Sequence, residues 1–169
     1  MNTYIALLRA VNVGGTGKLP MAELRALCEA AGFQGVRTYI ASGNVLLRSD
    51  SSAVQVKAAL EAALARYAGK PVGVLVRTGA EMTAVIAANP FPAAPPNRVV
   101  AIFLDGAPPA DTLETVRHLK DERIVPGKRE IYVHYGEGMA DSRLVIPAAK
   151  SGTARNMNTV VRLAAMAAE

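Results

Sequence analysis

The segment that follows the first apolar run has the composition of an anion-binding loop. Residues 3–11 form a run of strand length that ends in Asn12-Val13-Gly14-Gly15-Thr16-Gly17, followed by Lys18 and a predicted helix. Flexible backbone amides, a lysine and a helix N-terminus in one place favour an anion. The Walker pattern fails, because it needs Gly where Asn12 stands and Ser or Thr where Leu19 stands, so a P-loop enzyme is not expected. The alternative is that a short strand-to-helix connection simply needs glycine.

A second feature is an arginine near a predicted helix start. Ser151-Gly152-Thr153 is typical of a helix cap and predicts a helix over about 154–168. Arg155 then lies in the first turn, where the helix dipole disfavours a cation by a few tenths of a kcal/mol. A bound anion would reconcile the two, since the amides and the guanidinium would share one partner. The alternative is an arginine that is solvated or paired within the protein.

The net charge of +5 comes from the two ends of the chain. Residues 1–22 carry Arg9 and Lys18 and no acid, and residues 142–168 carry four basic side chains and no acid. Together these segments hold +6, and the remaining residues sum to −1. Acid-free basic stretches are usually solvated faces. Two of them at opposite ends of one chain also predict an anion site where the ends meet.

Hydrophobic periodicity in the first half predicts an α+β fold. The predicted strands cover 3–11, 36–41, 45–48 and 72–77, and the predicted helices cover about 21–31 and 53–67. The order β-α-β-β-α-β is that of the ferredoxin-like split motif, a four-stranded antiparallel sheet with two helices on one face. In this topology the loop after the first strand and the hairpin between the second and third strands share one edge of the sheet. We therefore expect Asn12, Gly14, Gly15 and Lys18 to lie near Ser42, Gly43 and Asn44.

The second half predicts a related β-α-β-β unit and a C-terminal helix. A helix at about 80–88 and a proline-rich stretch precede a continuous apolar strand at 99–104, a helix that opens at Pro108-Pro109-Ala110-Asp111, and a hairpin through Pro126-Gly127. The predicted organisation is a ferredoxin-like subdomain at 1–78, a helix and proline-rich connection at 79–97, and a second α+β subdomain at 98–169 that packs on the first.

Composition excludes several classes of protein. The one cysteine rules out a disulfide scaffold, and two histidines cannot build a zinc site of the Cys/His type. Neither basic stretch contains a carboxylate, so we expect no metal and no cofactor. The N-terminus has no basic n-region and no apolar run approaches about 20 residues, which predicts a cytoplasmic protein without a membrane partner. Cys28 lies on the apolar face of the first helix and is expected to be a buried structural thiol.

Several blocks spread along the chain form an ordered pattern. They are Tyr4-Ile5-Ala6-Leu7-Leu8-Arg9, Asn12-Val13-Gly14-Gly15, Arg37-Thr38-Tyr39-Ile40-Ala41-Ser42-Gly43-Asn44-Val45, Asn89-Pro90-Phe91, and Arg155-Asn156 with Asn158-Thr159-Val160. This pattern resembles the bacterial domain-of-unknown-function family 1697. The resemblance implies a small α+β protein with ferredoxin-like halves and no established activity, and it adds Asn156 and Thr159 to the candidate ligand-binding residues. The chain departs from the family at Ala10, Ala41 and Met157, where the family shows Gly, Gln and Trp, and the missing Trp weakens any proposal of ring stacking on a ligand.

Three functions remain open. The first is binding or transformation of a small anion, a phosphorylated metabolite or nucleotide, with Arg9, Lys18 and Arg155 as charge partners. The second is a protein-interaction or assembly module in which the polar motifs hold loops. The third is nucleic-acid binding, which is less favoured because the central strands offer only Tyr4 for stacking. No residue stands out as a nucleophile or general base, so the sequence decides neither enzymatic activity nor an oligomeric state.

Overall fold

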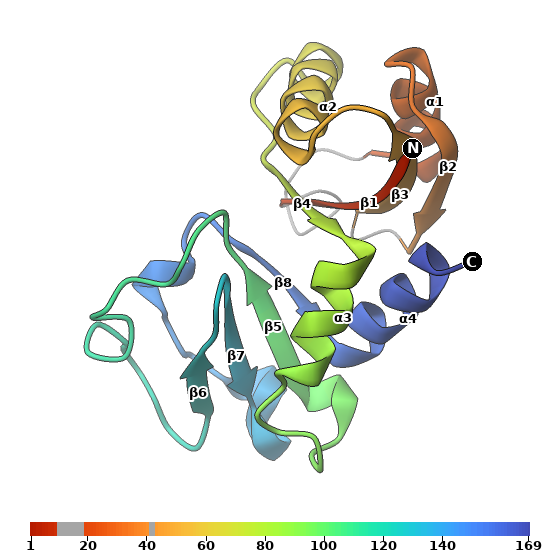
Figure 1. Ribbon diagram of the computed structural model, residues 1–169. Coiled ribbons are helices and arrows are strands. Elements are labelled where there is room, and N and C mark those ends of the chain that lie inside the picture. Colours follow the sequence, from red (N-terminus) through yellow and green to blue (C-terminus); the bar gives the residue numbers. More distant parts are fainter. Residues whose placement is uncertain (10–18, 41–42) are drawn as a thin grey trace. The chain divides into compact units, whose positions relative to one another are not determined.

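The computed structural model describes residues 1–9, 19–40 and 43–169. This part of the chain forms two four-stranded antiparallel sheets and four α-helices (Figure 1), which confirms the α+β class. The elements are β1 (Asn2–Leu8), α1 (Met21–Ala30), β2 (Gln34–Tyr39), β3 (Asn44–Ser49), α2 (Ala53–Ala68), β4 (Val74–Thr78), α3 (Gly79–Ala87), a 3₁₀ helix (Pro96–Arg98), β5 (Val99–Phe103), β6 (Arg123–Pro126), β7 (Glu130–His134), two further 3₁₀ helices (Gly136–Asp141 and Pro147–Ala149), β8 (Thr153–Asn156) and α4 (Met157–Ala167).

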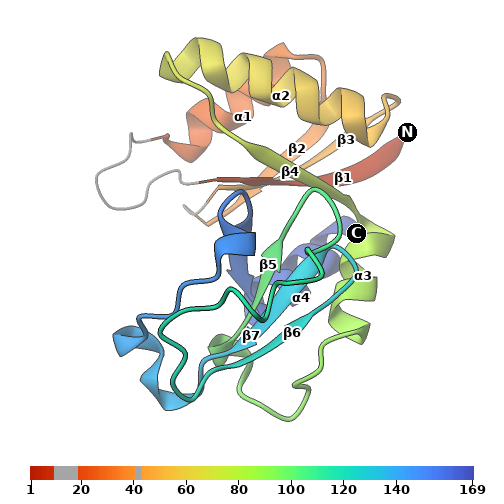
Figure 2. The same ribbon diagram turned by 90° about the vertical axis from the view of Figure 1, so that its left-hand side faces the viewer.

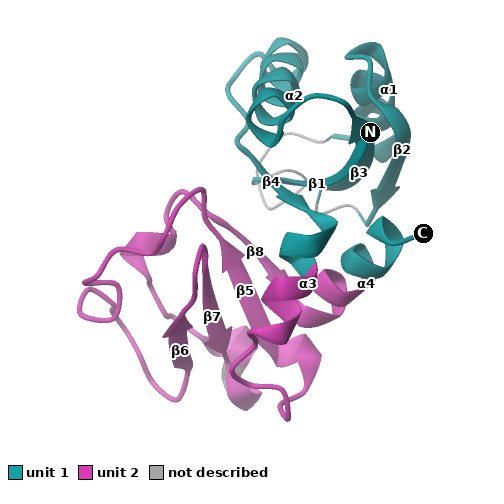
Figure 3. Cartoon of the chain, in the orientation of Figure 1, with its two compact units in different colours: residues 1–82, 163–169 teal, residues 83–162 magenta. Residues whose placement is uncertain are grey.

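The chain divides into two compact units (Figure 3). Unit 1 comprises residues 1–82 and 163–169, and unit 2 comprises residues 83–162. None of the helices in the described ranges has both the length and the apolar character needed to cross a bilayer.

Unit 1 has the predicted β-α-β-β-α-β order. Its strands are arranged β2-β3-β1-β4, and α1 and α2 cover one face of the sheet (Figure 2). Successive side chains of a strand point to opposite faces, so Tyr4, Ala6 and Leu8 of β1 pack against these helices. Cys28 of α1 belongs to the same core, as predicted.

The other face of this sheet is also buried. Ile5, Leu46 and Leu75 have at most 1 % of their surface exposed, and so does Arg77 of β4. Burial on both faces explains why the first strand is apolar without interruption. The end of α4 belongs to this unit, where Arg37 of β2 donates from Nη2 to the Met166 carbonyl at 2.6 Å.

Unit 2 repeats the sheet order of unit 1, with strands arranged β6-β7-β5-β8. On one face of this sheet, Val100, Ile102 and Ile131 belong to a hydrophobic core, and partly buried residues around Ile146 pack against it. The helix expected to open at Pro108 is wrong, because residues 110–115 form turns. There the Thr112 hydroxyl donates to the Pro109 carbonyl, a local bond that competes with the helical ladder.

The helix expected over about 154–168 is wrong at its start. Residues 153–156 form strand β8, and α4 begins at Met157. The N-cap is Asn156, whose Oδ1 accepts from the Thr159 amide at 3.0 Å. Pairing of β8 with β5, with Arg155 opposite Ala101, outweighs the local capping signal of residues 151–153. Arg155 therefore precedes the helix, and the expected conflict with the helix dipole does not exist.

In both sheets, the strand that comes last in the chain leads into a helix through residues of the same kind. In unit 1, Arg77 of β4 lies opposite Ile5, and Thr78 then accepts from the Glu81 amide at 3.1 Å as α3 begins. In unit 2, Arg155 of β8 is followed by the capping Asn156 and by α4. The last strand of each sheet thus contains a buried arginine and ends in a capping residue, after which a helix begins.

Candidate functional site

The end of β1 and the β2–β3 hairpin meet at one edge of the unit 1 sheet. The Leu8 amide donates to the Gly43 carbonyl at 2.9 Å, and the Arg9 amide donates to the Gly73 carbonyl at 2.9 Å. Asn44 lies opposite Leu7 in the ladder. The end of the first strand therefore lies beside the hairpin, while the predicted convergence of residues 12–18 with the hairpin stays a prediction. The other predicted members of this group, Asn12, Gly14, Gly15, Lys18 and Ser42, lie outside the described residues.

The side chain of Arg9 lies against Gly73. A Cβ atom built on Gly73 would lie 3.0 Å from Arg9 Cδ, so the stem of the arginine lies directly over the glycine backbone. Arg9 is partly buried at this edge. A side chain at position 73 would have to push the stem of Arg9 aside by a few tenths of an ångström, so the glycine leaves room for this stem.

The hairpin beside Arg9 is held in an unusual conformation. Ile40 has a φ of 54°, in the left-handed region that a β-branched residue rarely adopts, and Gly43 has a φ of 90°. The buried Asn44 stabilises this turn, because its Nδ2 donates to the Tyr39 carbonyl at 2.9 Å. Strained backbone costs on the order of 1–3 kcal/mol and is found most often at functional positions.

The third predicted group, Arg155 with Asn156 and Thr159, belongs to unit 2. Arg155 donates from Nη1 to Thr153 Oγ1 at 2.7 Å and to the Ala154 carbonyl at 2.9 Å. Burial lowers the pKa of Arg155 to about 10, which leaves it protonated at neutral pH. Asn156 and Thr159 form the N-cap of α4. The polar contacts named here fix the start of that helix.

Two polar cavities were missed by sequence reasoning. One, of about 620 Å³, lies in unit 1 and is lined by arginines of α1, β2 and β3. The other, of about 590 Å³, lies in unit 2 and is lined by residues 118–122, Tyr135 and residues 141–143. Each draws on segments far apart in the sequence, so only the strand register could have predicted them.

The unit 2 cavity contains a carboxylate that is held ionised. Ser142 Oγ donates to Glu122 Oε2 at 2.5 Å, and the Lys120 amide donates to Oε1 at 2.7 Å. These hydrogen bonds, with that of Ser142 the largest cause, lower the pKa of Glu122. His118 lies beside them with a φ of 59°. A carboxylate with a lowered pKa is a weak base, so the group suits hydrogen-bond acceptance better than proton transfer.

Metal binding has no support in the described residues. Within residues 1–9, 19–40 and 43–169, no group of three or more His, Cys, Asp and Glu side chains is placed to hold a metal ion. The polar groups described at the Arg9 edge and at the start of α4 are guanidinium, amide and hydroxyl groups, which recognise anions and polar molecules.

The fold and the edge around Arg9 define a small α+β protein with two related sheets and a basic sheet edge. The chain belongs to the family described as "Protein of unknown function (DUF1697)", whose pattern matches residues 1–132. It is similar in fold to the conserved bacterial protein SP0830 from Streptococcus pneumoniae, with a TM-score of 0.79 and 24 % identity over 98 % of each chain. No curated protein shows a significant match to the chain.

Proposed function

We propose that the protein binds a small anion, a phosphorylated metabolite or nucleotide, at the sheet edge formed by Arg9, Gly43 and Asn44. The observation that carries the proposal is the position of Arg9, with its backbone bonded to Gly73 and its stem lying over that glycine. An arginine guanidinium can donate two parallel hydrogen bonds to a phosphate, and its planar shape reduces the entropy lost for each bond.

Further support comes from the residues that flank this edge. Ile40 at the start of the hairpin turn has a strained φ of 54°, and the sequence after Arg9 contains Lys18 and glycines. A lysine side chain and backbone amides are groups that complete a phosphate site. The buried single cysteine fits the reducing cytoplasm, where such metabolites are found.

A role as an interaction or assembly module is the second candidate. It is favoured by the unit 2 group, because Arg155 bonds to Thr153 and Ala154 and Asn156 caps α4. On this account these polar residues hold structure and need no ligand.

Nucleic-acid binding is less favoured than either. RNA-binding sheets of this topology stack bases on aromatic rings of their central strands. The aromatic residue of β1, Tyr4, packs into the core beneath α1 and α2. The opposite face presents Ile5, Leu46 and Leu75, which are aliphatic and buried.

The test is a thermal-shift screen with inorganic phosphate, pyrophosphate, AMP and sugar phosphates. A ligand present at 100 times its Kd stabilises the protein by about 2.7 kcal/mol, which corresponds to a rise in Tm of roughly 5–10 °C. We expect Arg9→Ala to abolish this rise. Arg66→Ala, which removes an exposed arginine from α2, is the matched control and should keep it. An unmoved Tm across the panel, or an equal rise in Arg9→Ala, would contradict the proposal.

A further inference from the structure

We propose a second binding site in unit 1, in the cavity between α1, β2 and β3, which takes a small hydroxylated molecule with one oxyanion group. The cavity measures about 620 Å³ and is lined by Arg25, Arg37 and Arg48, one from each element. That volume lies within the roughly 300–1,000 Å³ typical of small-molecule sites. The site does not depend on the proposed function of the Arg9 edge.

The two sites lie at opposite ends of β3. In the β1–β3 ladder, Asn44 of the first site is opposite Leu7, whereas Arg48 is opposite Thr3. The ladder places these positions four residues apart along the strand, so a ligand in one site does not use the arginine of the other.

A bulge in β2 shapes the second site. The register between β2 and β3 shifts between Gln34 and Arg37, and Gly35 within the bulge has a φ of 56°. A Cβ atom on Gly35 would lie 3.1 Å from Arg48 Cδ and 3.4 Å from Cγ. The stem of Arg48 therefore lies along the glycine backbone, which limits where its guanidinium can go.

The charged side chains that line the cavity are three arginines and two glutamates, which leaves one cation in excess. Arg25 Nε lies 3.8 Å from Glu29 Oε2, and Arg37 Nη1 lies 2.6 Å from Glu169 Oε2. Within the described ranges of the chain, the Arg48 guanidinium has no hydrogen-bond or ion-pair partner.

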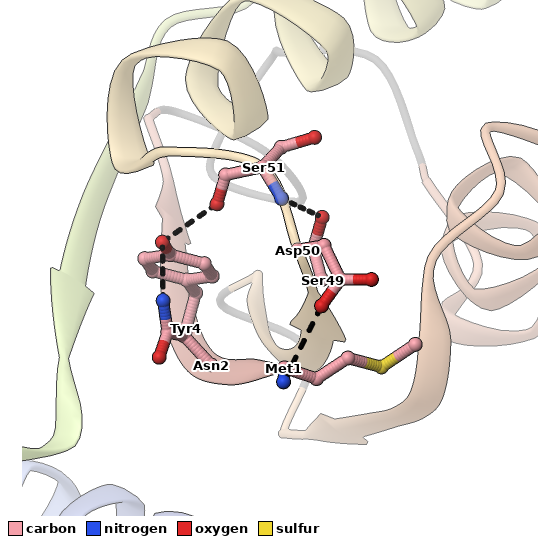
Figure 4. Close-up of polar contacts among 6 residues, drawn as sticks. All are labelled: Met1, Asn2, Tyr4, Ser49, Asp50 and Ser51. Carbon is pink, nitrogen blue, oxygen red and sulfur yellow. Dashed lines mark hydrogen bonds and ion pairs between the residues drawn. The ribbon is translucent and has the colours of Figure 1, made fainter.

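The N-terminal amine at the rim of the cavity is also neutralised. The Met1 amine pairs with Asp50 Oδ1 at 3.3 Å (Figure 4). The nearby hydrogen bond from the Tyr4 hydroxyl to the Ser51 carbonyl, at 2.7 Å, ties β1 to the same turn. Among the side chains that line the cavity, the one cation in excess is Arg48.

This balance defines the ligand. A single oxyanion matches the one cation in excess, while a second negative charge would meet the carboxylates of Glu29 and Glu169. Those carboxylates accept hydrogen bonds, so the body of the ligand should offer hydroxyl donors. Sugar acids have both properties, and gluconate is the probe of choice.

The test is a calorimetric titration of the full chain with gluconate, with glucose as the uncharged counterpart. We expect gluconate to bind, glucose to bind at least about tenfold more weakly, and Arg48→Ala to weaken gluconate binding by about tenfold or more. Arg48→Gln keeps the stem over Gly35 and should lose the same affinity, which separates loss of charge from loss of packing. Arg9→Ala should bind gluconate like the wild type.

Three results would overturn the inference. They are no binding of gluconate, equal binding of gluconate and glucose, and unchanged affinity in Arg48→Gln. Circular dichroism of each variant verifies folding, and Arg48→Gln decides the matter if Arg48→Ala does not fold. Because this titration uses Arg48 variants and the phosphate screen uses Arg9 variants, failure of either proposal leaves the other standing.

Discussion

Cys28 shows how position alone removes reactivity from a thiol. This residue of α1 has no exposed surface and lies in the core between the two helices and the sheet of unit 1. Burial, followed by the nearby charge of Glu29, raises the pKa of Cys28 to about 12. The thiolate is the reactive form, so almost none is present at neutral pH.

We predict that Cys28 in the native protein does not react with Ellman's reagent at pH 8 and reacts promptly in denaturant. The measurement is the absorbance change with time, and it is unambiguous because the chain has one cysteine. The variant Arg66→Cys adds an exposed thiol on α2 and should label at once. Rapid labelling of the wild type under native conditions would show that the core around α1 opens.

Glu122 is the clearest case of a carboxylate tuned by one neighbour. The hydrogen bond from Ser142 is the largest cause of its lowered pKa. A carboxyl whose pKa is lower in the folded state stabilises the fold above its unfolded pKa of about 4.3. That contribution disappears as the pH falls through the folded pKa.

We predict that Ser142→Ala raises the pKa of Glu122 toward its ordinary value. Ionisation of Glu122 then stabilises the fold less, and the pH range over which this contribution is lost becomes narrower. An NMR titration of the Glu122 carboxyl carbon measures the change. Ser151→Ala removes an exposed hydroxyl elsewhere in unit 2 and serves as the control. An unchanged pKa of Glu122 in Ser142→Ala would contradict the assignment of the Ser142 hydrogen bond as the largest cause.

At the scale of elements, the prediction of a helix or strand depends on whether the contacts that decide its structure are local in the sequence. Helix α2 was predicted well because Ser52 and Gln55 form a capping box within four residues. The prediction of a helix from residue 154 is wrong because the local signal of residues 151–153 is that of a cap, while strand β8 forms only through pairing with β5. The helix predicted to open at Pro108 is wrong for a different, local reason, because the Thr112 hydroxyl donates to the Pro109 carbonyl and competes with the helical hydrogen bonds.

The capping box gives a prediction at this scale. Ser52→Ala should lower the free energy of unfolding by about 1 kcal/mol, because the Gln55 amide loses its acceptor at 3.2 Å. Urea denaturation measures the loss. Ser51→Ala is the matched control, since the hydrogen bonds of Ser51 to Tyr4 and Ser49 use its backbone atoms. Equal effects of the two substitutions would rule out the capping explanation.

At the scale of the whole molecule, the described part of the chain forms two sheets whose strands follow the same order. The sequences of the two units show no visible identity, and their likeness appears in the register, where Arg77 and Arg155 occupy matching places. Hydrophobic patterning could predict the strands, but it could not predict which residues of distant strands lie opposite each other.

The same distinction applies to the candidate sites. Topology predicts that the segment after the first strand lies near the hairpin between the second and third strands. The Leu8–Gly43 hydrogen bond places the end of β1 beside that hairpin, and the position of residues 12–18 stays a prediction. The cavity around Arg48 could not be predicted, because it depends on a bulge at Gly35 that shifts the register by an amount the sequence does not reveal.

The central claim is that the sheet edge around Arg9 binds a phosphorylated anion, and a site-resolved NMR titration with AMP and inorganic phosphate tests it most directly. We predict that the amide signals of Gly43, Asn44 and Gly73 shift in a saturable way, that Arg9→Ala abolishes the shifts, and that Arg66→Ala preserves them. Signals at these three residues that stay in place throughout the titration, or that shift equally in Arg9→Ala, would contradict the account.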